Sequence, residues 1–214
     1  MAKLSGPQRA PRSGAGPESL VVLLHGRGSN GDNLIDLADV IAGEFPDTAF
    51  HSPNAPIELG GFGFMWLPSD PVERLESGFL EATETIEEFI DELATGYGLP
   101  ASKIALMGFS QGSIMSIHLA PRRTEQLAGV VAFSGAMFTG DSLAEEMASR
   151  PPFLLIHGAD DMVLDAQGSV DAGARFDELG IPAEVHILPG LPHSIDRRGL
   201  DLAVSFLTRV LGGD

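Results

Sequence analysis

Short apolar segments alternate along the chain with segments in which apolar residues recur every three or four positions. Residues 20–24 form an apolar run that ends at a His-Gly turn, which is typical of a strand buried on both faces of a parallel sheet. Similar runs predict strands over residues 49–52, 104–109, 129–134, 153–157 and 183–188. Because parallel strands need crossover connections, the alternation predicts a mainly parallel sheet with helices on both faces.

Helices are predicted between these strands. One spans about residues 111–120 and is ended by Pro121, and another ends near residues 179–180. The apolar faces of three more helices are formed by Leu34, Leu37, Ala38 and Ile41, by Leu80, Ile86, Phe89, Ile90 and Leu93, and by Leu200, Val204, Leu207 and Leu211. Residues 53–71 are rich in proline and glycine and are predicted to form a long surface loop.

The composition is that of a folded soluble protein, and it excludes several kinds of partner. Among the 214 residues, 43% are hydrophobic and 20% are charged, and the length favours a single domain. The formal net charge of -17 would repel phosphate backbones and anionic lipid head groups, so we expect no nucleic-acid partner. The absence of cysteine excludes disulfides, thiolate catalysis and cysteine-ligated metals.

The N-terminal segment shows no targeting signal. Residues 1–17 contain three prolines and lack the apolar stretch of a secretory signal, so we expect a flexible tail ahead of a single domain over residues 18–214. No later segment approaches the roughly 20 apolar residues that span a bilayer. These patterns predict a cytoplasmic protein without stable membrane insertion.

Residues 108–112 read Gly-Phe-Ser-Gln-Gly and fit the G-x-S-x-G pattern of a nucleophile elbow. A predicted strand directly precedes them and a predicted helix directly follows, which is the context that the elbow requires. So tight a turn needs glycine at positions 108 and 112, because side chains there would collide with the neighbouring backbone. Ser110 is therefore the candidate nucleophile.

A serine hydroxyl needs a base that takes its proton and an acid that orients the base. In folds that use this elbow the chain order is serine, then acid, then histidine. Asp160 and Asp161 follow the predicted strand 153–157, so either one can supply the acid. His193 lies on a loop after the last predicted strand and is the candidate base. The remaining histidines are predicted to serve in packing or local hydrogen bonding: His25, His51, His118, His157 and His186.

The tetrahedral intermediate of acyl transfer needs amide donors for its oxyanion. One candidate is the amide of Gln111, at the start of the predicted helix, where the helix dipole is positive. The other is the amide of Arg27, in the glycine-rich turn of residues 25–28, where Gly26 lets the backbone approach the substrate.

Several separate motifs resemble those of the phospholipase/carboxylesterase family of small α/β-hydrolases, which includes acyl-protein thioesterases and bacterial carboxylesterases. The motifs that carry the resemblance are, in chain order, LLHGRGSN, PNAP, GLPASKIALMGFSQG, VAFSG, LLIHGADD and LPGLPH. They span about residues 20–211. The resemblance implies an α/β-hydrolase fold, and the length of the matching region leaves little room for a large cap domain.

The resemblance also implies roles for individual residues. It assigns Ser110 as the nucleophile, His193 as the base and Asp161 as the acid, because the family's acid falls three positions after the glycine of its His-Gly turn. Asp160 is the fallback for the acid. The family's oxyanion amides match the two amides named above, and its substrate loop corresponds to residues 53–78.

Some positions depart from the family pattern. Trp66 matches a family tryptophan, but Leu67-Pro68 replaces the Phe-Asp pair that often follows it. Ser113 stands where a third elbow glycine is common, and Met162 stands at a frequent proline position. These departures leave the triad intact and the acyl preference open. Residues 60–66 allow two interpretations, an apolar wall for an acyl chain or packing against the sheet.

These observations predict a serine carboxylesterase that hydrolyses short to medium acyl esters through an acyl-enzyme intermediate. Acyl thioesterase or lysophospholipase activity is the alternative, and a non-catalytic binding scaffold is less favoured. Gly26 and Trp66 are the candidate substrate contacts, the expected partner is a small-molecule ester, and no metal or organic cofactor is required. The oligomeric state stays open, a homodimer included.

Overall fold

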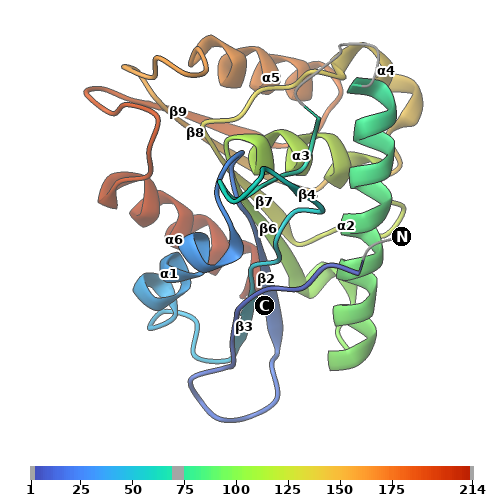
Figure 1. The fold of residues 1–214 in the computed structure, drawn as a ribbon, viewed down its shortest axis with the longest axis vertical. Coiled ribbons are helices and arrows are strands. Elements are labelled where there is room, and N and C mark those ends of the chain that lie inside the picture. The colour runs from blue at the N-terminus through green and yellow to red at the C-terminus, as the bar shows by residue number, and fades with distance from the viewer. Residues whose placement is uncertain (1–2, 69–74, 213–214) are drawn as a thin grey trace.

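A single large sheet organises the chain in the computed structural model, which describes residues 3–68 and 75–212 (Figure 1). Within these residues the sheet has seven strands in the order β1-β3-β2-β6-β7-β8-β9. The strands are β1 (Gln8–Arg9), β2 (Ser19–Leu24), β3 (Thr48–His51), β6 (Ile104–Phe109), β7 (Gly129–Phe133), β8 (Phe153–Gly158) and β9 (Ala183–Leu188). Among the described pairs of this sheet, only that of β1 with β3 is antiparallel, so the predicted mainly parallel sheet is confirmed.

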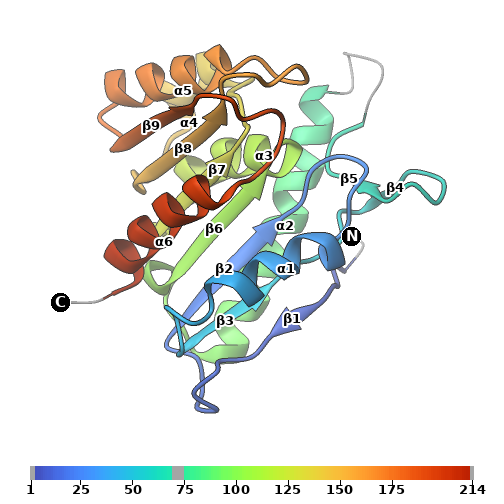
Figure 2. The same cartoon turned by 90° about the vertical axis from the view of Figure 1, so that its left-hand side faces the viewer.

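Helices cover both faces of this sheet (Figure 2). The described helices are α1 (Gly31–Ile41), α2 (Leu75–Tyr97), α3 (Gln111–Leu119), α4 (Gly140–Glu146), α5 (Gln167–Glu178) and α6 (Arg197–Leu211), with short 3-10 helices η2 (Ala101–Lys103) and η3 (Ala120–Arg122). Helices α1 and α6 pack on one face, whereas α2, α3 and α5 pack on the other. This is the two-sided cover that crossover connections between parallel strands produce.

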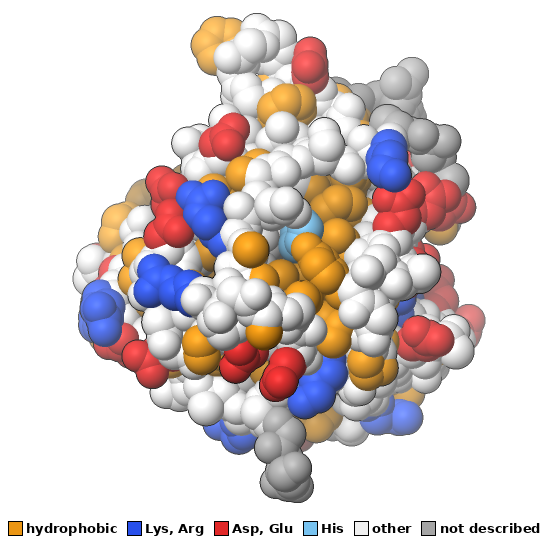
Figure 3. Space-filling model, turned by 90° about the horizontal axis from the view of Figure 1, so that it is seen from below, with side chains coloured by type: hydrophobic (Ala, Val, Ile, Leu, Met, Phe, Trp, Pro, Cys, Tyr) orange, Lys and Arg blue, Asp and Glu red, His pale blue; other side chains and the backbone are white. Residues whose placement is uncertain are grey.

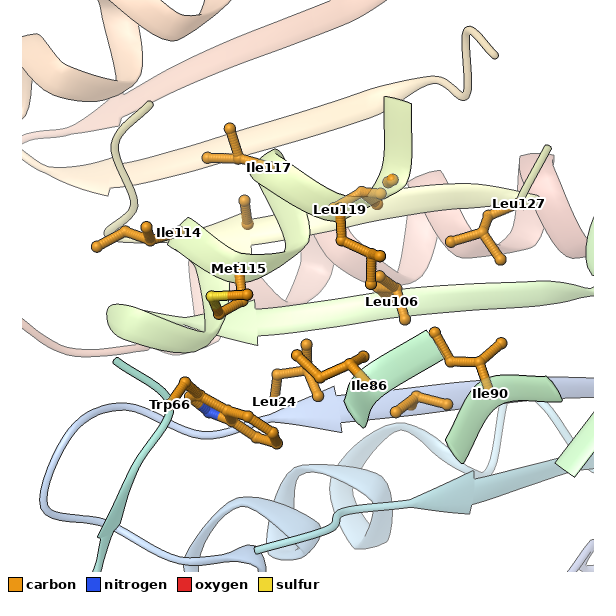
Figure 4. Packing of buried hydrophobic residues seen from close by; sticks show 14 of the residues in the cluster. Leu24, Trp66, Ile86, Ile90, Leu106, Ile114, Met115, Ile117, Leu119 and Leu127 are labelled. Atoms are coloured by element: carbon orange, nitrogen blue, oxygen red, sulfur yellow. The ribbon is translucent and has the colours of Figure 1, made fainter. Parts of the chain in front are cut away.

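The sheet separates two hydrophobic cores, and β2 contributes to both. Leu20, Val22 and Leu24 belong to the core under α2 and α3, while Val21 and Leu23 belong to the core under α1 and α6. Successive strand residues point to opposite faces, and all five side chains are fully buried. This explains why the strand is uniformly apolar. Figure 4 shows the first of these cores, in which Leu24, Ile86 and Met115 lie around Trp66 and Leu106 lies beside Leu119.

The N-terminal segment differs from its prediction as a flexible tail. Gln8 and Arg9 form β1, which pairs with β3, and the side chain of Leu4 is buried in the first core. The guanidinium of Arg9 also forms two hydrogen bonds of 2.8 Å with the carboxylate of Asp39 on α1. Backbone hydrogen bonds to the edge of β3 therefore give order to a segment whose sequence shows neither strand nor helix periodicity.

The predicted surface loop after β3 also differs from its prediction, as far as it lies within the described residues. It contains a small antiparallel hairpin of β4 (Ile57–Glu58) and β5 (Phe64–Met65), while residues 69–71 lie outside the described ranges. Strands of two residues are too short to show an alternating pattern. The turn between them contains Gly60, Gly61 and Gly63, all with positive φ, a conformation that favours glycine.

The carboxyl ends of β2, β6, β8 and β9 lie at one edge of the sheet because these strands are parallel. The loops that leave this edge are the places where a parallel sheet of this kind holds its ligands. With the exception of Trp66, every candidate site residue named from the sequence lies just after one of these four strands or on the loop that follows it.

Candidate active site

Ser110 stands alone between the last residue of β6 and the first residue of α3. Its backbone has φ 53° and ψ -117°, a region that residues with a side chain rarely adopt. Its amide donates to the carbonyl of Phe133 on the neighbouring strand (2.9 Å), and its carbonyl accepts from the amide of Ile114 (3.0 Å). The surrounding backbone thus holds the serine in a strained turn, with its side chain at the carboxyl edge of the sheet.

Two glycines make this turn sterically feasible. A Cβ atom on Gly112 would lie 1.9 Å from the carbonyl oxygen of Leu24, and one on Gly108 would lie 2.6 Å from the backbone of Gly112. The residue directly after this pattern, where the family resemblance implies a third glycine, is Ser113. Its hydroxyl donates to the carbonyl of Phe133 (2.7 Å), so this buried polar group is satisfied.

Asp161 and His193 meet across two neighbouring loops. The Nδ1 atom of His193 lies 2.6 Å from the Oδ2 atom of Asp161, whose side chain is fully buried. The other carboxylate oxygen, Oδ1, accepts from the amides of Val163 (2.8 Å) and Leu164 (3.0 Å). Burial by itself raises the pKa of the Asp161 carboxyl, but these amides and the His193 imidazole outweigh it, so this pKa lies below its usual value. The carboxylate is thus held ionised beside the imidazole.

Asp160, the alternative acid, does not share the buried environment of Asp161. It is exposed, and its backbone amide donates to the carbonyl of Leu191 (3.0 Å), which ties the loop after β8 to the loop that carries His193. A Cβ atom on Gly158 would lie 2.1 Å from the same carbonyl oxygen. Glycine at position 158 therefore lets the two loops approach closely enough for the contact between Asp161 and His193.

Ser110 and His193 line one open cleft of about 400 Å³. The remaining wall is formed by Gly26, Arg27, Ser29, Asn33, Leu34, Leu37, Phe109, Ser194 and Ile195. The ring of Phe109 lies against the imidazole of His193, with 4.9 Å between the ring centroids. The cleft can therefore take an apolar group beside a hydroxyl and an imidazole. Figure 3 shows the face of the molecule that is seen from below in Figure 1, on which hydrophobic side chains gather near the centre and acidic and basic side chains lie around them.

The turn after β2 is held by backbone hydrogen bonds to β5 and lies against Ser110. The amide of Gly28 donates to the carbonyl of Phe64 on β5, and the amide of Phe64 donates back to the carbonyl of Ser29, each over 2.8 Å. A Cβ atom on Gly26 would lie 3.2 Å from the Cβ atom of Ser110, so the backbone of this turn directly borders the serine. Arg27 follows Gly26 in the turn, and its side chain is exposed.

Gln111 links the elbow to the segment after β3. Because it is the first residue of α3, its amide has no acceptor within the helix. Its side-chain oxygen accepts from the amide of Trp66 (2.7 Å), and its side-chain nitrogen donates to the carbonyl of Leu67 (3.1 Å). The indole nitrogen of Trp66 donates to the carbonyl of His25 (2.9 Å). Trp66 thus joins the β2 turn to the elbow.

Comparison with known proteins gives this arrangement a family. Residues 12–211 match the model of the phospholipase/carboxylesterase family. The chain belongs to this family. A crystal structure of esterase PE8 matches this phospholipase/carboxylesterase protein with a TM-score of 0.92 and 41% sequence identity, covering 98% of this chain and 100% of that one.

Curated relatives agree. A probable carboxylesterase of Oryza sativa is 34% identical over 199 residues, which cover 85% of this chain and 74% of the relative. Acyl-protein thioesterase 1 of Cryptococcus neoformans is 28% identical over 221 residues, which cover 89% of this chain and 92% of the relative. These findings confirm the α/β-hydrolase fold and the family that the motifs indicated. The phospholipase/carboxylesterase protein described here is therefore a hydrolase that acts on ester bonds.

Trp66 in this family member lies both in a hydrophobic core and at the edge of a cavity. It is 1% exposed and packs in the first core, as the second interpretation predicted. It also borders a cavity of about 680 Å³ on the side of α2. The described residues around this cavity are Pro56, Ile57, Met65, Trp66, Pro68, Ser77, Gly78, Glu81, Ala82 and Thr85.

Two histidines that were predicted to serve in packing or local hydrogen bonding form such bonds within the site. His25 donates from Nδ1 to the carbonyl of Gly26 (2.8 Å) and accepts at Nε2 from the amide of Ala55 (3.0 Å). Burial lowers its pKa, although the bond to Gly26 opposes this. His157 contacts Asp161. Both histidines precede a glycine at the carboxyl end of a strand, a pattern that the sequence itself shows.

The chemistry available to this site is that of its side chains and amides. Across residues 3–68 and 75–212, no group of three or more histidine, aspartate and glutamate side chains is arranged to hold a metal ion. Over the same residues, none of the helices is long and apolar enough to cross a membrane. The arrangement can deliver a hydroxyl, a hydrogen-bonded imidazole and backbone amides to a bound ester.

Proposed function

We propose that the protein is a serine carboxylesterase that hydrolyses short to medium acyl esters, with Ser110 as the nucleophile, His193 as the base and Asp161 as the acid. The observation that carries this proposal is the 2.6 Å contact between the Nδ1 atom of His193 and the buried carboxylate of Asp161, in a cleft that Ser110 also lines. An imidazole held by a carboxylate at Nδ1 has its Nε2 atom ready to accept a hydroxyl proton.

The proposed reaction has two acyl-transfer steps. The Oγ atom of Ser110 forms a bond to the acyl carbon as its proton moves to Nε2 of His193, and the carbonyl electron pair moves to oxygen. Collapse of this intermediate breaks the bond to the alcohol oxygen, which leaves with the proton from His193. Water then attacks the acyl-enzyme, with His193 taking its proton and returning it to Ser110 as the carboxylic acid leaves.

The oxyanion of each intermediate would be held by the amides of Arg27 and Gln111. Both residues border Ser110, one through the turn next to Gly26 and the other as its direct neighbour at the start of α3. Preorganised donors of this kind contribute a few kcal/mol each to lowering the barrier. The hydrogen bonds of Trp66 to the β2 turn and to Gln111 support the spacing between the two amides.

The cleft and the cavity suggest where substrate groups lie. Gly26 leaves the space beside Ser110 free of a side chain, so we place the acyl carbonyl there. The cavity beside Trp66 has the volume and apolar walls for a chain of several carbons. An acidic surface, from a net charge of -17, favours neutral or cationic esters over anionic ones.

Thioester hydrolysis is the second candidate function, because a relative covering most of this chain is named an acyl-protein thioesterase. The same serine and imidazole would attack either acyl carbon. Kinetics on oxygen and thioesters with matched acyl groups separate the two, since kcat/KM compares transition-state binding directly.

The test of the proposed function is Ser110→Ala. We expect this variant to lose turnover of p-nitrophenyl butyrate by a factor of about a thousand or more. The reason is that no other hydroxyl of the cleft occupies the elbow between β6 and α3. A fluorophosphonate should label the unaltered protein on Ser110 and leave the variant unlabelled. Circular dichroism provides the control for folding. Retained turnover, or a lack of labelling in the unaltered protein, would refute the proposal, and the latter would favour a non-catalytic scaffold.

A further inference from the structure

A second imidazole, that of His157, contacts the same Oδ2 atom of Asp161 that His193 contacts. The ring of His157 is fully buried at the end of β8. Its Nε2 atom lies 3.1 Å from Oδ2 of Asp161 and 3.0 Å from the carbonyl oxygen of Leu164. Its Nδ1 atom lies 2.7 Å from the hydroxyl oxygen of Ser169, which in turn lies 3.0 Å from the carbonyl oxygen of Gly135.

These contacts determine where the proton of His157 resides. Both neighbours of Nε2 are oxygen atoms that only accept, so this nitrogen must carry a proton and donate it. The hydroxyl of Ser169 has one proton, which it gives either to Nδ1 of His157 or to the carbonyl of Gly135. The first arrangement makes the imidazole neutral and the second makes it a cation. In both arrangements the Nε2 proton points between Asp161 and Leu164.

The carboxylate of Asp161 therefore has four donors. Oδ2 receives the two imidazoles of His157 and His193, while Oδ1 receives the amides of Val163 and Leu164. His157 also closes the loop, because the same Leu164 that donates to Oδ1 accepts from Nε2. A carboxylate saturated in this way cannot rotate without breaking at least two hydrogen bonds.

We propose that His157 is a positioning residue for the proposed reaction, acting through Asp161. Its N–H fixes the Oδ2 atom in line with Nδ1 of His193, and it withdraws negative charge from the oxygen that attracts His193. The proposal rests on the proposed role of Asp161 as the acid. The other acidic residues of this loop, Asp160 and Asp165, are exposed, and Asp161 is the acidic residue in ion-pair contact with both His157 and His193.

Three variants test this role. His157→Leu removes the donor, and His157→Gln keeps an N–H near the position of Nε2. His118→Leu is the matched control, because His118 is also buried and hydrogen-bonded, to Thr139, but lies outside the cleft. Each variant is compared with the unaltered protein for kcat and KM on p-nitrophenyl butyrate, for the pH profile of kcat/KM and for thermal unfolding.

We expect His157→Leu to lower kcat about 10-fold to 100-fold with little change in KM, the range found when a buried partner of a site residue is removed. The acid limb of its kcat/KM profile should move upward by roughly 0.5 to 1 on the pH scale, because a less neutralised Asp161 stabilises the protonated form of His193 more strongly. His157→Gln should recover most of both effects. His118→Leu should lose thermal stability without moving the acid limb.

Other outcomes are equally informative. If His157→Leu keeps the unaltered acid limb, or loses no more kcat than His118→Leu, then His157 has a merely structural role and the proposal is overturned. If Ser110→Ala is also active, the proposed function itself has failed. Because the first result leaves Ser110→Ala inactive, the two failures are distinguishable.

Nitrogen-15 spectra of the histidine side chains give a measurement that does not depend on any variant folding. In the unaltered protein at pH 8, the Nε2 atom of His157 should show one-bond coupling to a proton. An unprotonated Nε2 atom would remove the donor on which the proposal depends.

Discussion

Asp160 and Asp161 are adjacent in the sequence but differ in every physical respect that matters for the proposed reaction. The side chain of Asp161 is buried and contacts His193, whereas Asp160 is exposed and contributes only its backbone amide to the next loop. Two neighbouring carboxylates thus provide a matched pair, in which one position should control the reaction and the other should not.

We expect Asp161→Asn to lower kcat about a thousandfold or more, because an amide at this position favours the wrong tautomer of the base. Asp160→Asn should leave kcat nearly unchanged while removing the same charge from the molecule. Steady-state kinetics with one short ester measure both. A larger loss in Asp160→Asn would transfer the acid role and contradict the geometry described above.

The sequence could predict most residues of the candidate active site, but not all of the contacts that these residues make. Ser110 was identifiable because a strand, a tight turn and a helix meet there, and His193 because it follows the last strand. The choice between Asp160 and Asp161 needed the family pattern, since both follow the same strand. The contact of His157 could not be predicted, because the distance from its ring to a carboxylate four positions later depends on how the intervening loop folds back.

At the scale of elements, the short strand β1 adds order that the sequence did not show. It closes the edge of the sheet at β3, buries Leu4 and places Arg9 against Asp39. Backbone pairing of two residues leaves no periodic pattern, so sequence reasoning had no signal for it. The same reason applies to the hairpin of β4 and β5, which was predicted as loop.

Removing β1 should therefore cost stability. We expect a chain without residues 1–12 to unfold at a temperature lower by about 5 °C or more, because burial of Leu4 and the pairing with β3 are both lost. Arg9→Ala is the control, since an exposed ion pair contributes at most about 1 kcal/mol. Scanning calorimetry of the three proteins checks this. An unchanged midpoint in the shortened chain would support the flexible tail that the sequence suggested.

The longer elements were predicted well because each has several apolar residues at one periodicity. Strands β6 and β9 begin and end where the sequence placed them, and α3 differs by one residue at its end. Helix α4 was missed, since its seven residues include one buried leucine, Leu143, and this is too little for a periodic signal.

For the molecule as a whole, two buried histidines outside the cleft link stability to pH. Burial lowers the pKa of His51 to about 4, and burial together with the charge of Arg122 lowers that of His118 to about 4. An unfolded histidine has a pKa near 6.5. Protons therefore bind the unfolded chain first as the pH falls, and the free energy of unfolding should decrease from about pH 6.5 to about pH 4.

Urea unfolding at several pH values between 7 and 4 measures this decrease. In His51→Gln it should be smaller, because one of the buried histidines that take up a proton on unfolding is gone. His186→Gln is the control, since His186 is more than a third exposed. An equal slope in all three proteins would show that the buried histidines do not govern acid stability.

The sheet divides the interior into two compartments whose side chains do not meet, one under α1 and α6 and one under α2, α3 and α5. Mutations that enlarge or shrink a side chain in one compartment need no compensation in the other. Each compartment can consequently accumulate its own substitutions during evolution, and the substitutions accepted in one should be nearly independent of those accepted in the other. The candidate site residues lie at the edge of the sheet between the two compartments. Substitutions in either compartment therefore affect them only through small displacements of the strands that carry them.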